Sequence, residues 1–323
     1  MAIQVYNGFD LESLASRLMQ DLSAEWRNPF DSPLVLFSDK KVEQWFQLYW
    51  LTCPQGGRTG RAVMNLRTVP LDRFLFSLLQ DPSLPVGKQE QRLTSDQLRN
   101  MLLAKLASRT ADGLLYYKTL GAAQVEAYLE RADGKSLDII HLYDFAEQLA
   151  KLFIDYEVTR PDDYDGQGRG LIEAWSRGDR FFDGSAVEDW QRRLYRDISL
   201  LLESSEPAYL TLPRLFFKNK QKNGGKPRFN YSGSGVYLLG FSGMGQIYRK
   251  ILQDFGAEHN LFIYVQGSPL LEQAENLLAK KWGAFGKENV SWWASCCPSG
   301  CSPAEASPAA DASSTLALLQ QAV

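Results

Sequence analysis

Residues 214–231 combine six basic side chains and four aromatic rings with no acidic residue. Cations that contact phosphates, together with rings that stack on bases, are the composition of a single-strand nucleic-acid binder. The alternative is a solvated loop whose rings anchor it to the core, and composition alone leaves both interpretations open. The basic side chains are those of Arg214, Lys218, Lys220, Lys222, Lys226 and Arg228.

The chain lacks the loop that would bind a nucleotide after its first strand. A P-loop wraps phosphates with several backbone amides and continues into Lys and Ser or Thr. After the apolar run Ile3–Tyr6, the predicted turn is only Asn7-Gly8-Phe9, without a lysine. Gly134-Lys135-Ser136 has Leu129 where the earlier glycine should stand, and no strand precedes it. We interpret that tripeptide as a solvated turn between helices.

The strand predicted at Val236–Leu239 ends without the carboxylate that would hold magnesium in an ATPase. Such a strand ends in Asp or Glu, whereas this one continues into Gly240-Phe241-Ser242. Both halves of the ATP machinery are therefore absent from an arrangement that otherwise resembles it. We predict no catalytic residue and no cofactor in this chain.

Cysteine and histidine are too few and too poorly spaced for metal chemistry. Three of the four cysteines are clustered and one is distant, so no zinc-site spacing emerges: Cys53, Cys296, Cys297 and Cys301. The histidines are only His141 and His259. We predict no metal site and reduced thiols, as in a cytoplasmic protein.

Length and composition indicate an ordinary globular protein. The 323 residues have room for two domains, or for one domain with a large insertion. The net charge of −3 is unlike that of a free-standing DNA-binding domain, so any DNA contact must come from a local patch. No run is apolar for the length of a membrane helix, and the start does not resemble a secretion signal, so we expect a cytoplasmic location.

The first 50 residues predict alternating strands and helices. A helix with apolar residues from Leu11 to Leu22 follows Ile3–Tyr6, and Asp10 can cap it. Leu34–Phe37 has the unbroken apolar character of a strand in a parallel sheet. Lys40 and Gln44 come early in the next helix, near the carboxyl end of that strand, where α/β sheets bind ligands. Plain surface solvation is the alternative.

The rest of the chain predicts a helical block and a return to the sheet. A helix through Leu142 and Tyr156 must stop before Pro161. After Val236–Leu239, a helix and the strand Leu261–Val265 restore the β-α-β order. We predict an α/β domain in two parts, at residues 1–71 and 231–290. Residues 72–230 would form a mainly helical insertion that ends in the basic loop. Residues 291–323 would be a flexible linker with a truncated end.

Short motifs in a specific order resemble the start of RecC-type subunits of exodeoxyribonuclease V, the RecBCD complex. Gln44-Trp45-Phe46-Gln47 is similar to the Q-W-L-Q of that family, and Phe153–Pro161 is similar to its L-F-D-Q-Y-x-x-Y-R-P stretch. Val236–Phe241 resembles V-F-I-C-G-I, and Asn276–Lys287 resembles N-P-L-L-A-x-W-G-x-x-G-R. Each motif alone is weak, but their order and spacing cover about residues 3–288.

The resemblance implies a degenerate superfamily 1 helicase-like, or P-loop NTPase-like, parallel-sheet domain with a large helical insertion. It implies the N-terminal part of a longer, non-catalytic subunit that acts in double-strand break repair by recombination. RecB-like and RecD-like subunits and DNA would be its partners, and ATP and magnesium would belong to those subunits. The family guides single strands and scans one of them for the recombination signal Chi.

The resemblance also places Chi-channel residues on this sequence. The positions carried over are Ser38, Lys40, Gln44, Pro70, Phe76, Lys151, Leu152, Ile154, Asp155, Arg160 and Arg214. Gln44, Leu152 and Arg160 keep the residue type of the family. Four others depart from it, so the same Chi sequence is not implied: Ser38, Lys40, Lys151 and Ile154.

Two other functions fit the same sequence. One is an enzyme, either an AddB-type helicase-nuclease subunit or an ATPase with an unusual loop, and the missing glycine-lysine motif speaks against it. The other is a structural scaffold without DNA readout. Loss of strand handling on substitution of Gln44, Arg160 or the basic residues would separate the DNA-handling subunit from the scaffold.

Overall fold

The computed structural model describes residues 3–8, 10–25, 32–52, 65–130, 137–160, 170–182, 186–241, 244–266 and 304–305. The chain divides into two compact units. The sheet unit comprises residues 1–75, 231–244 and 249–323, and the helical unit comprises residues 76–230 and 245–248. The predictions made for the cysteines, for Gly134-Lys135-Ser136 and for most of 291–323 lie outside the described residues.

The sheet unit is built on a six-stranded sheet with the strand order β3-β2-β6-β7-β1-β8. Each pairing between these strands is parallel. All four residues of β2 and all four of β6 are buried, as expected for parallel strands covered on both faces. This confirms the predicted α/β class with a parallel sheet. The strands are β1 Ile3–Gly8, β2 Leu34–Phe37, β3 Arg67–Thr68, β6 Val236–Leu239, β7 Leu261–Gln266 and β8 Ala304–Glu305.

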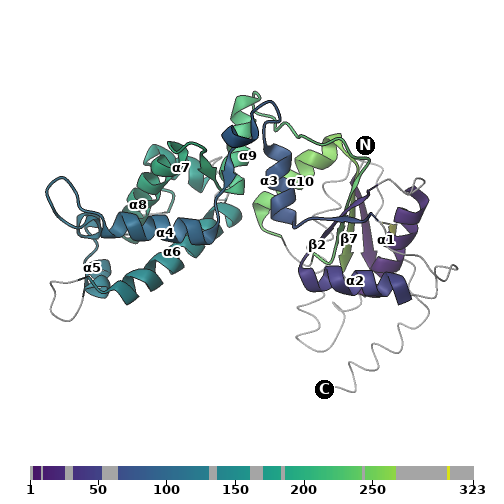
Figure 1. The fold of residues 1–323 in the computed structure, drawn as a ribbon, viewed down its shortest axis with the longest axis horizontal. Helices are drawn as coiled ribbons and strands as arrows, with labels where there is room; N and C mark the ends of the chain where they lie inside the picture. Colours follow the sequence, from purple (N-terminus) through teal and green to yellow (C-terminus); the bar gives the residue numbers. More distant parts are fainter. Residues whose placement is uncertain are drawn as a thin grey trace, which may run out of the picture. The chain divides into compact units, whose positions relative to one another are not determined.

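Helices α1 and α2 cover one face of this sheet (Figure 1). The apolar residues of α1 recur at helical spacing, and Leu14, Leu18 and Leu22 are fully buried. Phe46 and Trp50 of α2 join the same core and meet edge to face, with ring centroids 5.5 Å apart. The helices that begin or lie in this unit are α1 Leu11–Glu25, α2 Lys40–Thr52, α3 Leu71–Leu79 and α10 Gln246–Glu258.

Strand β1 is longer than the sequence predicts. Asn7 and Gly8 pair with Val265 and Gln266 of β7, so the prediction of a turn at these two positions is wrong. Phe9 lies outside the described residues. A Cβ atom on Gly8 would lie 2.8 Å from the side chain of Leu14, so a glycine here lets α1 pack against the strand end.

Ala304 and Glu305 pair with Tyr6 and Asn7 and extend the sheet beyond β1. The sequence predicts a linker over 291–323, and at these two described residues that prediction is wrong. Pairing supplies hydrogen-bond partners to backbone groups of β1 that would otherwise form an open sheet edge.

The helical unit contains helices and a small parallel pair of strands, β4 and β5. Its core includes Leu102, Tyr117, Phe153 and Trp175, each no more than 2% exposed. No helix among the described residues is long and apolar enough to span a membrane. The elements are η2 Val86–Lys88, β4 Gln91–Arg92, α4 Ser95–Ala107, η3 Tyr116–Leu120, α5 Ala123–Leu129, α6 Ile139–Thr159, α7 Leu171–Arg177, α8 Ala186–Glu203, β5 Tyr209–Leu210 and α9 Leu212–Lys222.

Helix α6 confirms the predicted helix and its end. Asp138 caps it, because its carboxylate accepts from the backbone amides of Ile140 at 2.9 Å and His141 at 3.3 Å. The helix ends at Thr159, and Arg160 at its C-cap has left the helical conformation. The proline that follows explains this end, because the residue before a proline disfavours the α conformation.

The segment 214–231 is not one loop, because α9 occupies Leu212–Lys222. Pro213 stands in the first turn, where its missing N–H costs nothing. Leu212, Leu215 and Phe216 follow helical spacing and are all buried. The prediction of a loop is therefore wrong for the first half of the segment, because these apolar residues form a helix face that packs into the core.

Candidate nucleic-acid interface

The carboxyl ends of β2 and β6 meet at one edge of the sheet. The strands run parallel, and the amide of Ser38 donates to the carbonyl oxygen of Leu239 at 3.3 Å. Asp39 then caps α2, accepting from the amides of Lys41 at 2.7 Å and Val42 at 3.0 Å. This cap sets the first turns of α2, which carry Lys40 and Gln44, beside the strand ends.

The candidate side chains of the sheet unit are accessible to solvent. Ser38, Gln44 and Pro70 are exposed, and the side chain of Lys40 is 75% exposed. The ammonium of Lys40 lies 3.6 Å from Glu43, whose carboxylate also accepts from the hydroxyl of Thr68 at 2.8 Å. Because an exposed pair contributes at most about 1 kcal/mol, Lys40 is able to exchange this partner for a phosphate.

Gly240 allows β6 to pass close to the start of α2. Its φ of +85° lies in the left-handed region, which L side chains rarely adopt. A Cβ at this position would lie 3.0 Å from Val42 and 3.1 Å from the hydroxyl oxygen of Ser38. The candidate edge therefore depends on glycine at the end of β6.

We expect Gly240→Ala to lower the free energy of unfolding of the sheet unit by about 1–2 kcal/mol, the cost of a left-handed conformation in a residue with a Cβ. The close contact with Val42 would add to that cost. Chemical denaturation followed by tryptophan fluorescence would measure the loss. As a control, Gly87→Ala should have little effect, because nothing lies within 4 Å of a Cβ at Gly87. Equal stability of wild type and Gly240→Ala would contradict the argument.

The N-terminus of α1, after β1, is already occupied by a carboxylate. Asp10 accepts from the amide of Ser13 at 2.6 Å. The free amides of a helix N-terminus following a strand are the groups that bind a phosphate in nucleotide sites. A built-in carboxylate satisfies one of these amides and places negative charge where a phosphate would come. The first candidate nucleotide position therefore has no lysine, and a carboxylate already accepts from one amide of its helix N-terminus.

Four candidates of the helical unit follow one another along α6. Lys151 and Asp155 are exposed, and Lys151 forms an ion pair with Glu147 at 2.6 Å. Leu152 and Ile154 are half-buried and pack against the core. The helix therefore presents two charged positions to solvent and uses two apolar positions to hold itself in place.

Arg160, just beyond the end of α6, lies near two aromatic rings. Its guanidinium carbon is 4.8 Å from the ring centre of Tyr156 and 5.1 Å from that of Phe182. Such cation–π contacts favour the position of the charge without neutralising it. Arg160 is thus a half-buried cation held in place by rings.

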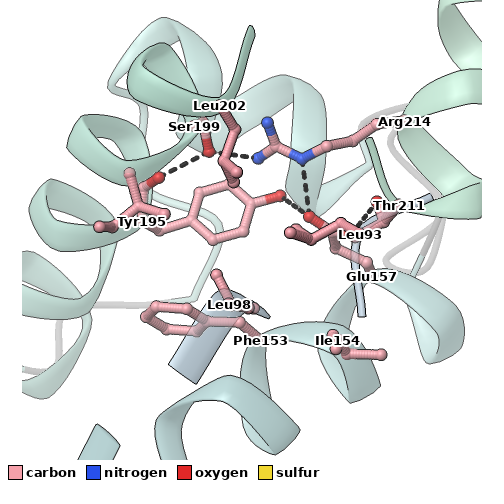
Figure 2. Close-up of a pocket in the computed structure, with 11 residues that line it drawn as sticks. Leu93, Leu98, Phe153, Ile154, Glu157, Tyr195, Ser199, Leu202, Thr211 and Arg214 are labelled. Atoms are coloured by element: carbon pink, nitrogen blue, oxygen red, sulfur yellow. Dashed lines mark hydrogen bonds and ion pairs between the residues drawn. The ribbon is translucent and has the colours of Figure 1, made fainter. Parts of the chain in front are cut away.

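Two residues carried over from the family are buried within the helical unit. Phe76 is 5% exposed and Arg214 is 7% exposed. Figure 2 shows the guanidinium of Arg214 lying between Ser199 and Glu157, in a closed cluster of side chains. Burial gives Arg214 a structural role, so we leave it out of the interface proposed below.

Glu157 is the centre of this buried cluster. It accepts from Nε of Arg214 at 2.8 Å and from the hydroxyls of Tyr195 and Thr211. Arg214 also donates to Glu203 at 2.9 Å and to Ser199, and its guanidinium carbon lies 4.7 Å from the ring centre of Tyr195. The cluster therefore ties α6, α8 and α9 together.

The charges of the cluster stabilise each other against the cost of burial. Burial raises the pKa of Tyr195 well above its usual value, so its phenol stays protonated and donates to Glu157. Burial alone would lower the pKa of Arg214, but the hydrogen bond and the charge of Glu157 oppose it, and the pKa of Arg214 is raised. Glu157 is not among the site residues predicted from the sequence, although an acidic residue four positions after Phe153 on an apolar face indicates a buried charge.

The remaining basic candidates of 214–231 differ in their surroundings. Lys218 pairs with Glu90 at 3.0 Å, and Lys222 pairs with Asp81 at 2.5 Å. The ammonium of Lys220 lies 5.4 Å from the ring centre of Phe216. Lys226 and Arg228 are exposed.

Within the described ranges, no group of three or more His, Cys, Asp or Glu side chains is placed to hold a metal ion. These residues form an α/β protein with a parallel sheet, in which cations lie beside one sheet edge and along a helix of the helical unit. The family model of the RecC N-terminal domain matches residues 3–290, and the chain belongs to the RecC family. Membership assigns it a role related to the RecBCD complex in DNA repair and recombination. No curated protein matches the chain.

Proposed function

We propose that this chain is the N-terminal, DNA-handling part of a RecC-type subunit that has no ATPase or nuclease site of its own. Its sheet unit would be a degenerate helicase domain of superfamily 1, and RecB-like and RecD-like subunits would supply the motors, ATP and magnesium. The observation that carries the proposal is the state of the two strand ends where a helicase would bind ATP. Asp10 caps the helix after β1, and the residue that follows β6 is Gly240 instead of an acidic residue.

We further propose that the chain contributes to a channel that guides one strand and scans it for Chi. In the sheet unit, the exposed positions Ser38, Lys40, Gln44 and Pro70 would face the strand. In the helical unit, the corresponding positions are Lys151, Asp155 and Arg160, with Leu152 and Ile154 supporting them. Cations would contact the backbone, whereas Gln44 has the amide that reads a base edge.

The absence of a nucleotide site is tested by photo-cross-linking the reconstituted complex with an azido derivative of ATP. We expect label on the partner subunits and none on this chain, because its helix after β1 is capped by Asp10. The same complex should hydrolyse ATP at its normal rate when Asp10 is replaced by asparagine, a residue that also caps helices. Specific labelling of this chain, displaced by excess ATP, would instead favour the AddB-type enzyme.

The strand-reading role is tested with Gln44→Ala and Arg160→Ala in the full subunit, assembled with its partners. We expect unwinding within about twofold of wild type. Signal recognition should fall about tenfold or more in Gln44→Ala, because a lost base contact costs about 1–3 kcal/mol. It should also fall in Arg160→Ala, because that variant loses a cation that would position the strand through its backbone. Recognition would be measured by mapping where degradation halts on a random-sequence DNA library.

Lys41→Ala is the control for these variants, since Lys41 is exposed on the same helix but is not a channel candidate. It should leave the halting positions unchanged. If Gln44→Ala and Arg160→Ala also left halting and unwinding unchanged, the chain would be a scaffold without DNA readout.

A further inference from the structure

The basic side chains at the end of α9 fall into two electrostatic groups. Lys218 and Lys222 are matched by carboxylates, at 3.0 Å from Glu90 and 2.5 Å from Asp81. Lys220, Lys226 and Arg228 have no ion pair with any residue that the structure describes. Among the described residues, the positive charge of 214–231 that no ion pair neutralises thus lies at these three positions.

The segment after α9 is held in a defined conformation. The side-chain amide of Asn219 donates to the carbonyl oxygens of Leu79 at 2.8 Å and Arg228 at 3.1 Å. The side-chain oxygen of Asn219 accepts from the backbone amide of Arg228 at 2.7 Å. The amide of Asn230 donates to the carbonyl oxygen of Leu78 at 2.7 Å. The backbone that carries Arg228 is therefore fixed before any ligand binds, which lowers the entropic cost of binding.

The aromatic rings of 214–231 are used inside the protein. Phe216 is fully buried, and Phe229 is half-buried. The hydroxyl of Tyr231 donates to the carbonyl oxygen of Gly235 at 2.7 Å, and burial raises its pKa to about 12. Base stacking requires an open ring face. These rings are therefore less available for base stacking than the composition of the segment suggests. Contacts from this surface would be to phosphates.

We propose that Lys220, Lys226 and Arg228 form a surface that binds the phosphodiester backbone of DNA without regard to base sequence. This rests on the proposed function, since it adds a backbone contact to the strand-handling role. It differs from the channel positions in two ways: its cations belong to α9 and the segment that directly follows it, and it would carry no sequence information.

The test is the salt dependence of DNA binding by the reconstituted complex, with the full subunit carrying Lys226→Ala and Arg228→Ala together. Duplex ends with single-stranded tails of two unrelated sequences would be titrated at several salt concentrations. Each lost phosphate contact should reduce the slope of log K against log salt by about one. We therefore expect a slope smaller by about two, equally for both sequences, and adding Lys220→Ala should reduce it further.

The matched control is the double variant Lys218→Ala with Lys222→Ala, which removes the same net charge from the same helix end. It should leave the slope unchanged, because these two lysines already neutralise Asp81 and Glu90. Equal slope losses in the two double variants would mean that only bulk charge matters, and would overturn the proposal. Loss of subunit assembly in the Lys226/Arg228 variant would also overturn it, by assigning the surface to an acidic protein partner.

Failure of this inference and failure of the proposed function give different results. If the wild-type complex binds and unwinds DNA but the Lys226/Arg228 variant keeps the full slope, only the inference fails. If the wild-type complex does not bind DNA ends, the proposed function itself fails.

Discussion

Replacement of Glu157 by alanine is expected to lower the free energy of unfolding of the helical unit by about 3–5 kcal/mol. Breaking a buried ion pair by removing one partner leaves an uncompensated charge in a poorly solvated place. Glu157 is 3% exposed, and its carboxylate accepts from Arg214, Tyr195 and Thr211. All three donors would lose their acceptor at once.

Hydrogen exchange of the amides of α6, α8 and α9 would measure this loss in the intact chain. Exchange reports the stability of these helices separately from that of the sheet unit. We expect protection to fall by two to three orders of magnitude, since about 1.4 kcal/mol corresponds to a factor of ten. Unchanged protection in Glu157→Ala would show that the cluster does not hold the helices together.

Glu203 supplies a matched control, because it contacts the same guanidinium from the surface. It lies 2.9 Å from Arg214, but its side chain is 53% exposed. Glu203→Ala should cost less than about 1 kcal/mol, as for other solvated pairs. Exchanging Glu157 for leucine and Arg214 for methionine together should destabilise less than either single change, because no buried charge would remain.

A second large effect is expected from Glu188→Leu, at about 3 kcal/mol. Glu188 is 2% exposed and accepts from Nε1 of Trp175 at 2.9 Å. It also accepts from the amides of Phe181 at 2.5 Å and Phe182 at 3.1 Å. Each buried donor left without an acceptor costs about 1–3 kcal/mol, and the amides of Phe181 and Phe182 are only partly buried.

The Glu188→Leu variant should also alter the surroundings of Arg160. Phe182, whose backbone Glu188 holds, supplies one of the two rings beside the Arg160 guanidinium. Hydrogen exchange at residues 170–182 should become faster, and signal recognition by the assembled complex should fall, as expected for Arg160→Ala. Full protection at these amides would contradict the assigned role of Glu188.

Glu173→Gln is the control for Glu188→Leu. Glu173 is an exposed residue of α7 that forms an i, i+4 ion pair with Arg177. Losing such a pair changes stability by about 0.5 kcal/mol or less. A comparable loss in both variants would point to a general sensitivity of α7 and α8.

The strands and most helices of the fold were predictable from local pattern. Unbroken apolar runs predicted the strands Leu34–Phe37 and Val236–Leu239, and every residue of both is buried. A capping carboxylate predicted the start of the first helix, and Asp10 accepts from the amide of Ser13 in its first turn. These signals work because each depends on neighbours only a few residues away.

Local pattern failed where a distant partner decided the structure. Asn and Gly are residue types that favour turns, but Asn7 and Gly8 pair with β7, more than 250 residues away, and this pairing keeps them in the strand. The basic composition of 214–231 suggested a loop, whereas packing of Leu215 and Phe216 makes its first half a helix. In both cases tertiary contacts outweighed weak local preferences.

The sequence by itself determined the α/β class, the parallel sheet and the family. The spacing of apolar residues, the capping residues and the order of the motifs are all local features of the sequence. From the sequence we also predict that the chain has neither the loop nor the acid of an ATP site. Only the tertiary structure decided which cations are available to a ligand. Arg214, Lys218 and Arg228 look alike in sequence, yet one is buried against Glu157, one is paired with Glu90, and one is exposed on a fixed backbone. The sequence gives the number of cations, but the residues that surround each cation in the folded protein determine its solvation and its ion pairs.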